Sequence, residues 1–471
     1  MIEVTKQLRR VAIIGGGITG LAAAYRLQQQ AREQQLPIEI VLIESFHRFG
    51  GKIHTVLTDN IVFEKGPESF VDRLGIIEEL ASSLGISDQL VHSIREDGYV
   101  AVNEDLYAVP KGVVFGVPTQ MKPFMTSDLV SWSGKARATL DFLRPQKKVD
   151  VDQSLGKLMR KRFGEEVVDN IVEPLLSGVF NGDIDELSYK ATLPFLQNEE
   201  VSKSLIQGVR TYTQQSDNMQ FKRQRSTFLG GLSTLVDELV KQLTDVKLVK
   251  GVRVTAIKKL GDQLMLSLNN DTSIKIDGVI IATPHTVAQQ LIKESELLAS
   301  LNDIPLNSVA TVSMSFDLSQ LPKSFKGTDI FVSRNSDVSI TSATLSSRIW
   351  SNIAPKDKLL IRAYIGKLGD EAIVDLSDKE IEKLVLQDLQ LLVGLTGQPQ
   401  KTIVTRWKHS MPQYTIGHTD KVKLAKQKLA IAYPTIRLAG NSYEGISLSK
   451  CVTQANDSAD ELLHELYQNQ L

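Results

Sequence analysis

A run of glycines directly after a short apolar segment constrains this chain more than any other feature. Gly15, Gly17 and Gly20 follow the apolar residues 11–14 and precede the helix-forming residues 21–25. This order predicts a buried strand that turns into a helix, with Gly15 permitting the turn and Gly20 allowing close packing on the strand. Gly17 lets the backbone approach a pyrophosphate, to which the helix N-terminus offers N–H groups and a positive dipole end. The turn therefore predicts a dinucleotide-binding βαβ unit.

A second strand with an acidic end follows at the expected distance. Residues 38–44 are mostly apolar and end in Glu44, and a carboxylate there suits the ribose hydroxyls of a dinucleotide. Next come Arg48, the glycine pair 50–51 and Lys52, which let the chain approach the cofactor and place cations near its pyrophosphate. A surface turn with flanking charges is the alternative for this segment taken alone. Together with the first glycine run, the pair favours FAD over NAD.

Distant segments are expected to complete an FAD site. A strand that ends at Gly440 leads through residues 441–447 into a helix, whose N-terminal dipole would face the flavin ring. The alternative is an ordinary capping loop with Ser447 or Ser449 as N-cap. The turn 66–69 offers backbone N–H and hydroxyl donors, and Val254 would line the adenine through its main chain.

Composition excludes several classes of protein. At 471 residues the chain is expected to form two or three domains. The net charge of −1 and the short basic clusters argue against nucleic-acid binding. One cysteine suits a reducing compartment, and seven scattered histidines predict no metal site. Residues 6–24 imitate a signal peptide, but cleavage there would delete the glycine run, so we expect a cytoplasmic protein.

The spacing of apolar residues predicts that helical and strand-rich stretches alternate along the chain. Residues 74–220 are mostly helical by their apolar spacing, apart from the apolar, proline-containing segment 109–132. Residues 228–282 read as a helix and then a meander of strands that returns to a buried parallel strand. Residues 309–366 alternate apolar and polar side chains, which predicts a sheet with one covered face. A last helix begins near Ser447.

A set of motifs runs in order along almost the whole chain: Gly15–Gly20, Glu44, Arg48–Lys52, Gly66–Phe70, Glu173–Gly178, Leu360–Gly366 and Ser410–Tyr414. Together they resemble those of the flavin oxidases of haem synthesis, and the similarity is closest to the coproporphyrinogen III oxidases of Gram-positive bacteria, formerly classed as protoporphyrinogen oxidases. Many relatives in the wider superfamily have Gly-Asp where this chain has Gly440-Asn441, which puts the usual ribityl-phosphate contact in doubt.

The resemblance implies an α/β fold of the flavin amine-oxidase-like superfamily. Its parts would be a Rossmann-type FAD-binding domain, an antiparallel-sheet substrate domain and a helical domain. The implied segments are 1–54, 228–300 and 405–471 for the FAD domain, 55–82, 187–227 and 301–404 for the substrate domain, and 83–186 for the helical domain.

The resemblance also implies the chemistry. A porphyrinogen would lose six electrons in three two-electron transfers to flavin N5, and dioxygen would reoxidise the flavin and release hydrogen peroxide. The preferred substrate would be coproporphyrinogen III, with protoporphyrinogen IX as the slower alternative and a downstream haem-synthesis enzyme as a candidate partner. Two competitors stay open: an amine or carotenoid oxidase of the same superfamily, and a non-enzymatic lipid-binding relative.

The predicted site residues come from the residue patterns and from what the family resemblance implies. We name no catalytic side chain, because the protein's work would be to hold a large apolar ring against the flavin. Arg73, Arg334 and Arg362 are the candidates for binding substrate propionates. We expect segment 109–132 to line the mouth of the substrate cavity, with at most peripheral membrane contact. The predicted FAD contacts are Gly15, Gly16, Gly17, Ile18, Thr19, Gly20, Glu44, Ser45, Arg48, Gly51, Lys52, Gly66, Pro67, Glu68, Ser69, Val254, Trp407, Gly445, Ile446 and Ser447.

Overall fold

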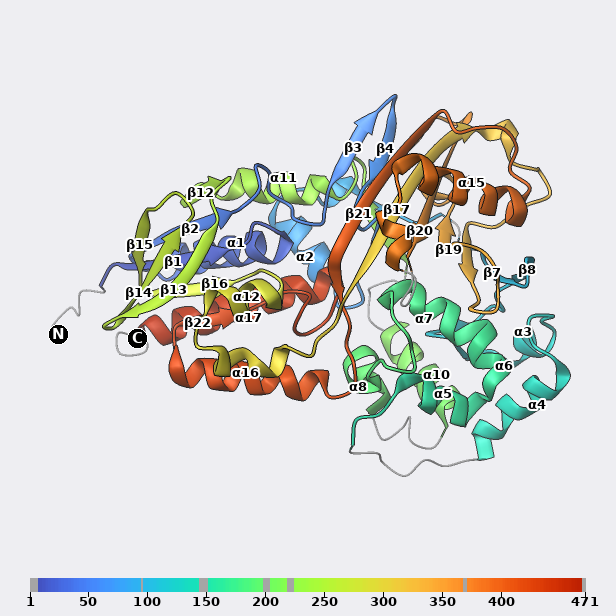
Figure 1. Ribbon diagram of the computed structural model, residues 1–471, viewed down its shortest axis with the longest axis horizontal. Coiled ribbons are helices and arrows are strands. Elements are labelled where there is room, and N and C mark those ends of the chain that lie inside the picture. The colour runs from blue at the N-terminus through green and yellow to red at the C-terminus, as the bar shows by residue number, and fades with distance from the viewer. Residues whose placement is uncertain are drawn as a thin grey trace.

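The computed structural model describes residues 7–94, 96–143, 151–197, 204–217, 224–366 and 371–467. Figure 1 shows an elongated molecule in three parts. A parallel sheet covered by helices lies at the end that holds both termini, a large, mostly antiparallel sheet lies at the other end, and a group of helices lies below the large sheet. Among the described residues, no helix is long and apolar enough to span a bilayer.

The parallel sheet is assembled from segments far apart in the sequence. Its strand order is β12-β2-β1-β16-β22, and every neighbouring pair is parallel. Strands covered on both faces must be apolar throughout, which explains the continuous apolar runs. The strands are β1 (Arg9–Ile14), β2 (Ile38–Glu44), β12 (Val246–Lys250), β16 (Gly278–Ile281) and β22 (Ile436–Leu438).

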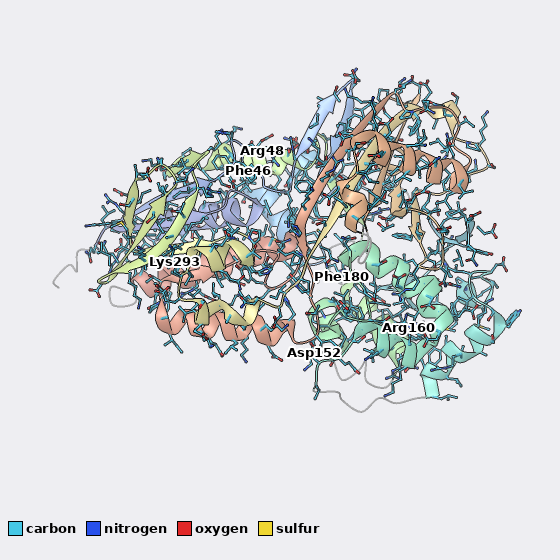
Figure 2. All side chains as sticks on the ribbon, viewed as in Figure 1. Phe46, Arg48, Asp152, Arg160, Phe180 and Lys293 are labelled. Atoms are coloured by element: carbon cyan, nitrogen blue, oxygen red, sulfur yellow. The ribbon has the colours of Figure 1, made fainter. Side chains whose placement is uncertain are left out.

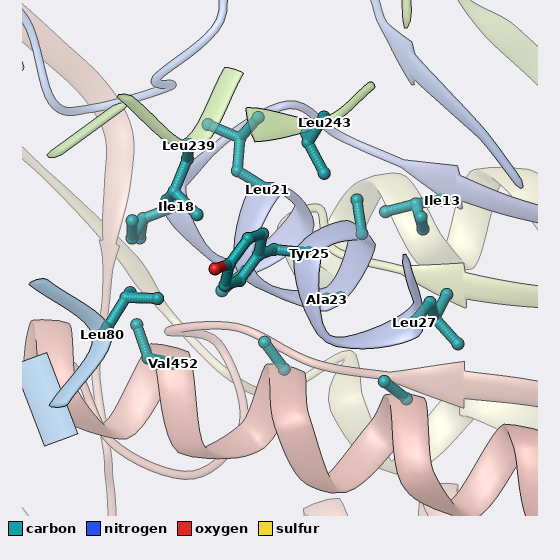
Figure 3. Packing of buried hydrophobic residues seen from close by; sticks show 14 of the residues in the cluster. Ile13, Ile18, Leu21, Ala23, Tyr25, Leu27, Leu80, Leu239, Leu243 and Val452 are labelled. Carbon is teal, nitrogen blue, oxygen red and sulfur yellow. The ribbon is translucent and has the colours of Figure 1, made fainter. Parts of the chain in front are cut away.

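Helices and a small meander cover the two faces of this sheet. On one face, α1 (Ile18–Glu33) packs between α11 (Ser233–Gln242) and α17 (Leu448–Tyr467), and Figure 3 shows Leu21 facing Leu239 and Leu243. The other face carries α12 (His285–Leu291), α16 (His418–Ala432) and the antiparallel strands β13 (Val254–Leu260), β14 (Gln263–Leu268) and β15 (Ser273–Ile276). The predicted βαβ unit, meander and returning parallel strand are confirmed.

The large sheet has the order β21-β17-β20-β19-β18-β7-β8. The prediction of one covered face is wrong for β17, because its polar residues Thr311, Ser313 and Ser315 are as buried as its apolar ones. The strands are β7 (Gly98–Val102), β8 (Asp105–Ala108), β17 (Leu306–Asp317), β18 (Asp329–Val332), β19 (Ile340–Thr344), β20 (Lys358–Ile365) and β21 (Lys401–Pro412).

The stretch 74–220 is less helical than predicted. Residues 90–108 form β6 (Leu90–His92), β7 and β8, and β7 pairs in parallel with the distant β18, a contact that no local pattern announces. The helices of this stretch are α2 (Ile76–Ser83), α3 (Met121–Met125), α4 (Trp132–Thr139), α5 (Leu155–Phe163), α6 (Glu165–Val167), α7 (Glu173–Phe180), α8 (Tyr189–Thr192) and α10 (Leu205–Asp217), with a π-helical turn at Val168–Val172.

The remaining strands and α-helices include α15 (Asp378–Val393), which packs on the large sheet. The others are β3 (Thr55–Thr58), β4 (Ile61–Glu64), β5 (Phe70–Val71), β9 (Val113–Val114), β10 (Val117–Pro118), β11 (Arg225–Phe228), α13 (Ser295–Leu298) and α14 (Ser346–Ile349). We propose that the chain divides into the FAD, substrate and helical domains given above. In this division β7 and β8 belong to the segment 83–186 but pair within the large sheet.

Candidate cofactor and substrate site

A cavity of about 2340 Å³ lies where the three parts of the molecule meet. Its wall takes residues from the carboxyl ends of the parallel strands, from one face of the large sheet and from α7 and α8. Figure 2 shows Phe46 and Arg48 in the parallel-sheet part and Phe180 at the junction with the helices, and all three line the cavity. Pockets for small ligands are typically about 300–1,000 Å³, so this volume suits a dinucleotide together with a second large molecule.

The glycine turn has the close contacts that its sequence predicts. Gly15 has φ +106°, and a Cβ atom on Gly20 would overlap the carbonyl oxygen of Gly15, far inside 3.0 Å. Gly17 caps α1 without a side-chain hydrogen bond, so no side chain covers the first N–H groups of the helix. A Cβ atom on Gly51 would lie 3.0 Å from the Gly17 Cα atom. The two glycine loops are therefore pressed together and leave bare backbone facing the cavity.

Glu44 joins the end of β2 to the glycine turn. Its carboxylate accepts hydrogen bonds from the backbone N–H of Gly16 at 2.6 Å and of Phe46 at 2.8 Å. It is 7% exposed and lines the cavity. The Ser45 hydroxyl donates to the same carboxylate at 3.1 Å, so three of its four acceptor positions are occupied and one, on the oxygen that accepts from Gly16, is left for a ribose hydroxyl.

Two cations flank the same wall. Arg48 donates to the carbonyl oxygens of Phe49, Gly51 and Ile53, which shapes the second glycine loop, and burial lowers its pKa. The Lys52 ammonium donates to the carbonyl oxygen of Ser410, and burial lowers the pKa of Lys52 to about 8. These contacts hold both side chains in the cavity wall.

The Gly66 turn is fastened by three neighbouring strands of the large sheet. The carbonyl oxygen of Lys65 accepts from Trp407 Nε1 and from Thr311 Oγ1, both at 2.9 Å. The Gly66 carbonyl accepts from Arg362, whose guanidinium also donates to the Tyr364 hydroxyl at 2.6 Å. These hydrogen bonds tie Lys65 and Gly66 to the large sheet, which holds the following turn against the cavity.

Most of the predicted cofactor contacts reach the cavity. Gly16 and Gly20 lie behind its wall within the glycine turn, and Glu68 is not part of the wall. The Glu68 carboxyl lies in a buried charged group with Arg362 and Arg225, and burial raises its pKa. The residues that line the cavity are Gly15, Gly17, Ile18, Thr19, Glu44, Ser45, Arg48, Gly51, Lys52, Gly66, Pro67, Ser69, Val254, Trp407, Gly445, Ile446 and Ser447.

The loop before α17 caps the helix and also lines the cavity. Ser447 caps the helix, since its hydroxyl accepts from the Lys450 N–H at 3.2 Å and its carbonyl from the Cys451 N–H at 3.0 Å. The same segment, Gly445 to Ser447, lines the cavity. The N-terminus of a twenty-residue helix therefore lies at the cavity wall, and its contact with the flavin remains a proposal.

The three candidate propionate-binding arginines differ in position. The Arg73 guanidinium lies 4.4 Å from the centre of the Phe115 ring, in the cavity wall, and Arg362 also lines the cavity. Arg334 does not, because Glu173, Asp183 and Asp185 hold its guanidinium at 3.4, 3.3 and 3.7 Å. Arg362 is only 3% exposed, and its terminal nitrogens donate to the Tyr364 hydroxyl and the Gly66 carbonyl. Arg73 is therefore the stronger candidate inside the cavity, and Arg362 the weaker one.

The far part of the cavity is lined by aromatic side chains, most of which the sequence analysis did not identify. Phe195 stacks on Tyr212 with ring centres 4.3 Å apart and contacts Phe115 at 5.0 Å. Phe180 and Tyr364 join them in the wall. Of the segment 109–132, only Phe115 reaches the cavity, because the neighbouring apolar residues pack into the helical core. These five aromatic residues come from five separate segments of the chain.

The residues present fit FAD. Uncapped N–H groups at α1, bare glycine backbone, Arg48 and Lys52 suit a pyrophosphate, and Glu44 suits a ribose. Thr283 Oγ1 is buried at the cavity wall with no hydrogen-bond partner among the described residues, which leaves a polar group for a ligand to satisfy. In the described part of the chain, no cluster of His, Cys, Asp or Glu could hold a metal ion.

Comparison with known proteins gives the family. Residues 18–463 match the family described as flavin containing amine oxidoreductase. The chain is 42% identical to the coproporphyrinogen III oxidase of Bacillus subtilis (strain 168), over 98% of this chain and 99% of that protein. It is 35% identical to the coproporphyrinogen III oxidase of Staphylococcus aureus (strain NCTC 8325 / PS 47), over 97% of this chain and 100% of that protein.

Solved structures agree with the sequence comparison. One from Exiguobacterium sp. 255-15, whose assignment as a protoporphyrinogen oxidase is provisional, superposes with a TM-score of 0.87 at 32% identity, over 97% of this chain and 100% of that one. Reduced UDP-galactopyranose mutase shares the fold at a TM-score of 0.72 and 14% identity, over 97% and 95% of the two chains. The chain therefore belongs to the flavin-containing amine oxidoreductases, among their porphyrinogen oxidases, and is an FAD enzyme.

Proposed function

We propose that this enzyme oxidises coproporphyrinogen III to coproporphyrin III in haem synthesis, with dioxygen as the final electron acceptor and protoporphyrinogen IX as a slower substrate. The observation that carries the proposal is the continuity of the cavity. The cofactor wall at Lys52 and Trp407 opens directly into the aromatic part at Phe115 and Phe195. The names of the relatives at 42% and 35% identity support the same substrate.

The far part of the cavity suits a flat apolar macrocycle with acidic substituents. Phe115, Phe180 and Phe195 supply apolar surface against such a ring. Arg73 and Arg362 supply guanidinium groups, which bind carboxylates through paired hydrogen bonds. Burying the ring against these side chains excludes water from the reacting carbon atoms.

The reaction balances without a nucleophile from the protein. Porphyrinogen loses six electrons and six protons, and three dioxygen molecules take them up as three molecules of hydrogen peroxide. Bound FAD supplies the two-electron acceptor between substrate and dioxygen. The residues of the chain hold the macrocycle and FAD in contact, and we assign no catalytic side chain.

Steady-state assays with a substrate panel test the proposal. Coproporphyrinogen III should give porphyrin fluorescence together with three dioxygen molecules consumed and three peroxide molecules formed per porphyrin, and protoporphyrinogen IX should react more slowly. Heat-denatured enzyme controls for spontaneous oxidation of the porphyrinogens. Oxidation of benzylamine with neither porphyrinogen consumed would contradict the proposal and favour an amine oxidase.

We also propose that the enzyme works in the cytoplasm with at most peripheral membrane contact, and that it can hand its product to a later haem-synthesis enzyme. The single, buried cysteine supports a reducing compartment. Fractionation of cells at physiological salt tests the location. Recovery chiefly in the membrane pellet, with release only by detergent, would contradict it.

A further inference from the structure

One phenol group joins the two ends of the loop that precedes α17. The Tyr414 hydroxyl donates to the carbonyl oxygen of Asn441 at 2.7 Å and accepts from the backbone N–H of Gly445 at 2.8 Å. Tyr414 is 2% exposed and lies at the end of β21, outside the loop that it closes. A five-residue loop is thus held at both ends by a single side-chain oxygen.

His418 holds the middle of the same loop. Its Nε2 atom lies 2.8 Å from the carbonyl oxygen of Tyr443, so Nε2 carries the proton and donates. The imidazole stacks on the Tyr414 ring at 4.0 Å between ring centres, and burial lowers the pKa of His418 to about 4. A neutral imidazole and a phenol therefore form one stacked unit that contacts three backbone groups of the loop.

The loop has further contacts, one of them the backbone hydrogen bond that the Tyr443 N–H donates to the Gly440 carbonyl at 3.1 Å. Ser442 Oγ accepts from the backbone N–H of His285 at 3.2 Å, and the Glu444 carboxylate pairs with Lys426. None of these contacts reaches Gly445, which has φ +113° and lines the cavity together with Ile446 and Ser447. The placement of Gly445 therefore depends on the Tyr414 hydroxyl.

We propose that Tyr414 and His418 are positioning residues for the cofactor. By closing the loop, they place Gly445–Ser447 and the N-terminus of α17 against the flavin ring. A helix N-terminus in that place stabilises negative charge on the reduced ring, so the two side chains set the affinity for FAD and raise its reduction potential. The proposal rests on the predicted flavin contact of Gly445–Ser447 and is independent of which substrate the enzyme oxidises.

Tyr414→Phe in the holoenzyme tests the proposal, because it keeps the stacked ring and removes both hydrogen bonds. The matched control is Tyr467→Phe, which removes a hydroxyl that donates to the Pro37 carbonyl at 2.9 Å, at the far end of α17. Both variants lose hydrogen bonds from a buried tyrosine, so a merely structural role of the hydroxyl predicts the same behaviour. His418→Phe provides a second variant that keeps the stack and loses the donor to Tyr443.

The measurements concern the flavin itself. The rate of FAD release on dilution, followed by free-flavin fluorescence, should rise about tenfold in Tyr414→Phe, since each lost hydrogen bond costs about 0.5–1.5 kcal/mol. The flavin reduction potential, measured against a reference dye, should become more negative. With any oxidisable substrate, kcat should fall while KM stays within about twofold. Tyr467→Phe should match wild type in all three measurements.

His418→Phe should change the release rate and the potential in the same direction, by less than Tyr414→Phe. If Tyr414→Phe does not fold, His418→Phe carries the test. A folded Tyr414→Phe or His418→Phe with the wild-type release rate and potential overturns the proposal, as does Tyr467→Phe with equal effects. An enzyme that oxidises no porphyrinogen would overturn the proposed function alone, because release rate and potential need no substrate.

Discussion

Gly17 and Gly20 lie in the same turn, yet the structure predicts opposite consequences when each gains a side chain. A Cβ atom on Gly17 would meet only the Gly51 Cα atom, at 3.9 Å, and the Gly17 φ of −74° suits any residue. A Cβ atom on Gly20 would overlap the backbone carbonyl of Gly15. A backbone atom cannot move aside as a flexible side chain can, so α1 would have to leave the strand.

The magnitudes follow from these contacts. Gly17→Val should lower the free energy of unfolding of the apoprotein by no more than about 1 kcal/mol, the scale of a lost N-cap preference. It should weaken FAD binding by about 100-fold or more, because loss of two backbone contacts to phosphate costs about 1.5–3 kcal/mol each. Gly20→Ala should cost about 3 kcal/mol or more of folding stability, as severe overpacking does.

Urea unfolding of the apoproteins, followed by circular dichroism, measures the first quantity. Titration of each apoprotein with FAD, followed by quenching of flavin fluorescence, measures the second. Wild-type FAD affinity in Gly17→Val would refute the assignment of the bare backbone to the pyrophosphate. Equal loss of stability in both variants would refute the distinction between a ligand contact and a packing contact.

Other predictions concern charged residues. Burial lowers the pKa of Lys52 to about 8, and the phosphates of bound FAD should raise that pKa. The affinity for FAD should therefore decline as pH rises above 8 in the wild type and stay constant in Lys52→Met. A decline in both proteins would contradict a role for Lys52. Burial raises the pKa of Glu64 from 4.5 to about 7, so the folded protein keeps a proton that the unfolded chain releases. The free energy of unfolding should therefore fall by about 3 kcal/mol between those pH values, and Glu64→Gln should remove this slope in urea titrations. Arg73→Gln should raise KM for coproporphyrinogen III about tenfold, as loss of one carboxylate contact does, whereas Arg334→Gln should leave it unchanged; the reverse order would restore Arg334 as a propionate ligand.

Sequence patterns predicted the parallel-sheet part closely. The strand, glycine turn, helix and acidic strand end around Gly20 and Glu44 are all present, as are the meander after Val254 and the helix that Ser447 caps. These features depend on neighbouring residues and on burial of both faces, so a short window of sequence contains the information. The predictions failed for residues 90–108, because β6 pairs with β11 more than 100 residues away and β7 pairs with β18 more than 200 residues away.

The candidate site also has a part that the sequence predicts and a part that it does not. The cofactor wall could be predicted because its glycines and its carboxylate stand in a turn and at a strand end that neighbouring residues identify. Of the aromatic wall, only Phe115 lies in a segment predicted to line the cavity. Phe180 and Phe195 could not be predicted, because they have no distinguishing sequence pattern and reach the cavity only when the helices pack against the large sheet. Arg334 and Arg73 look alike in sequence, and only the carboxylates around Arg334 separate them.

The sequence by itself determined the cofactor, because a strand, a glycine turn and a terminal acid suffice to build a pyrophosphate and ribose site from consecutive residues. Tertiary structure alone decided how distant segments meet that site. Trp407, Thr311 and Arg362 converge on the carbonyls of Lys65 and Gly66 because β21, β17 and β20 are neighbours in the large sheet. Sheet order arises from the packing of the whole chain, and a hydrogen bond between residues hundreds of positions apart has no counterpart in any local pattern.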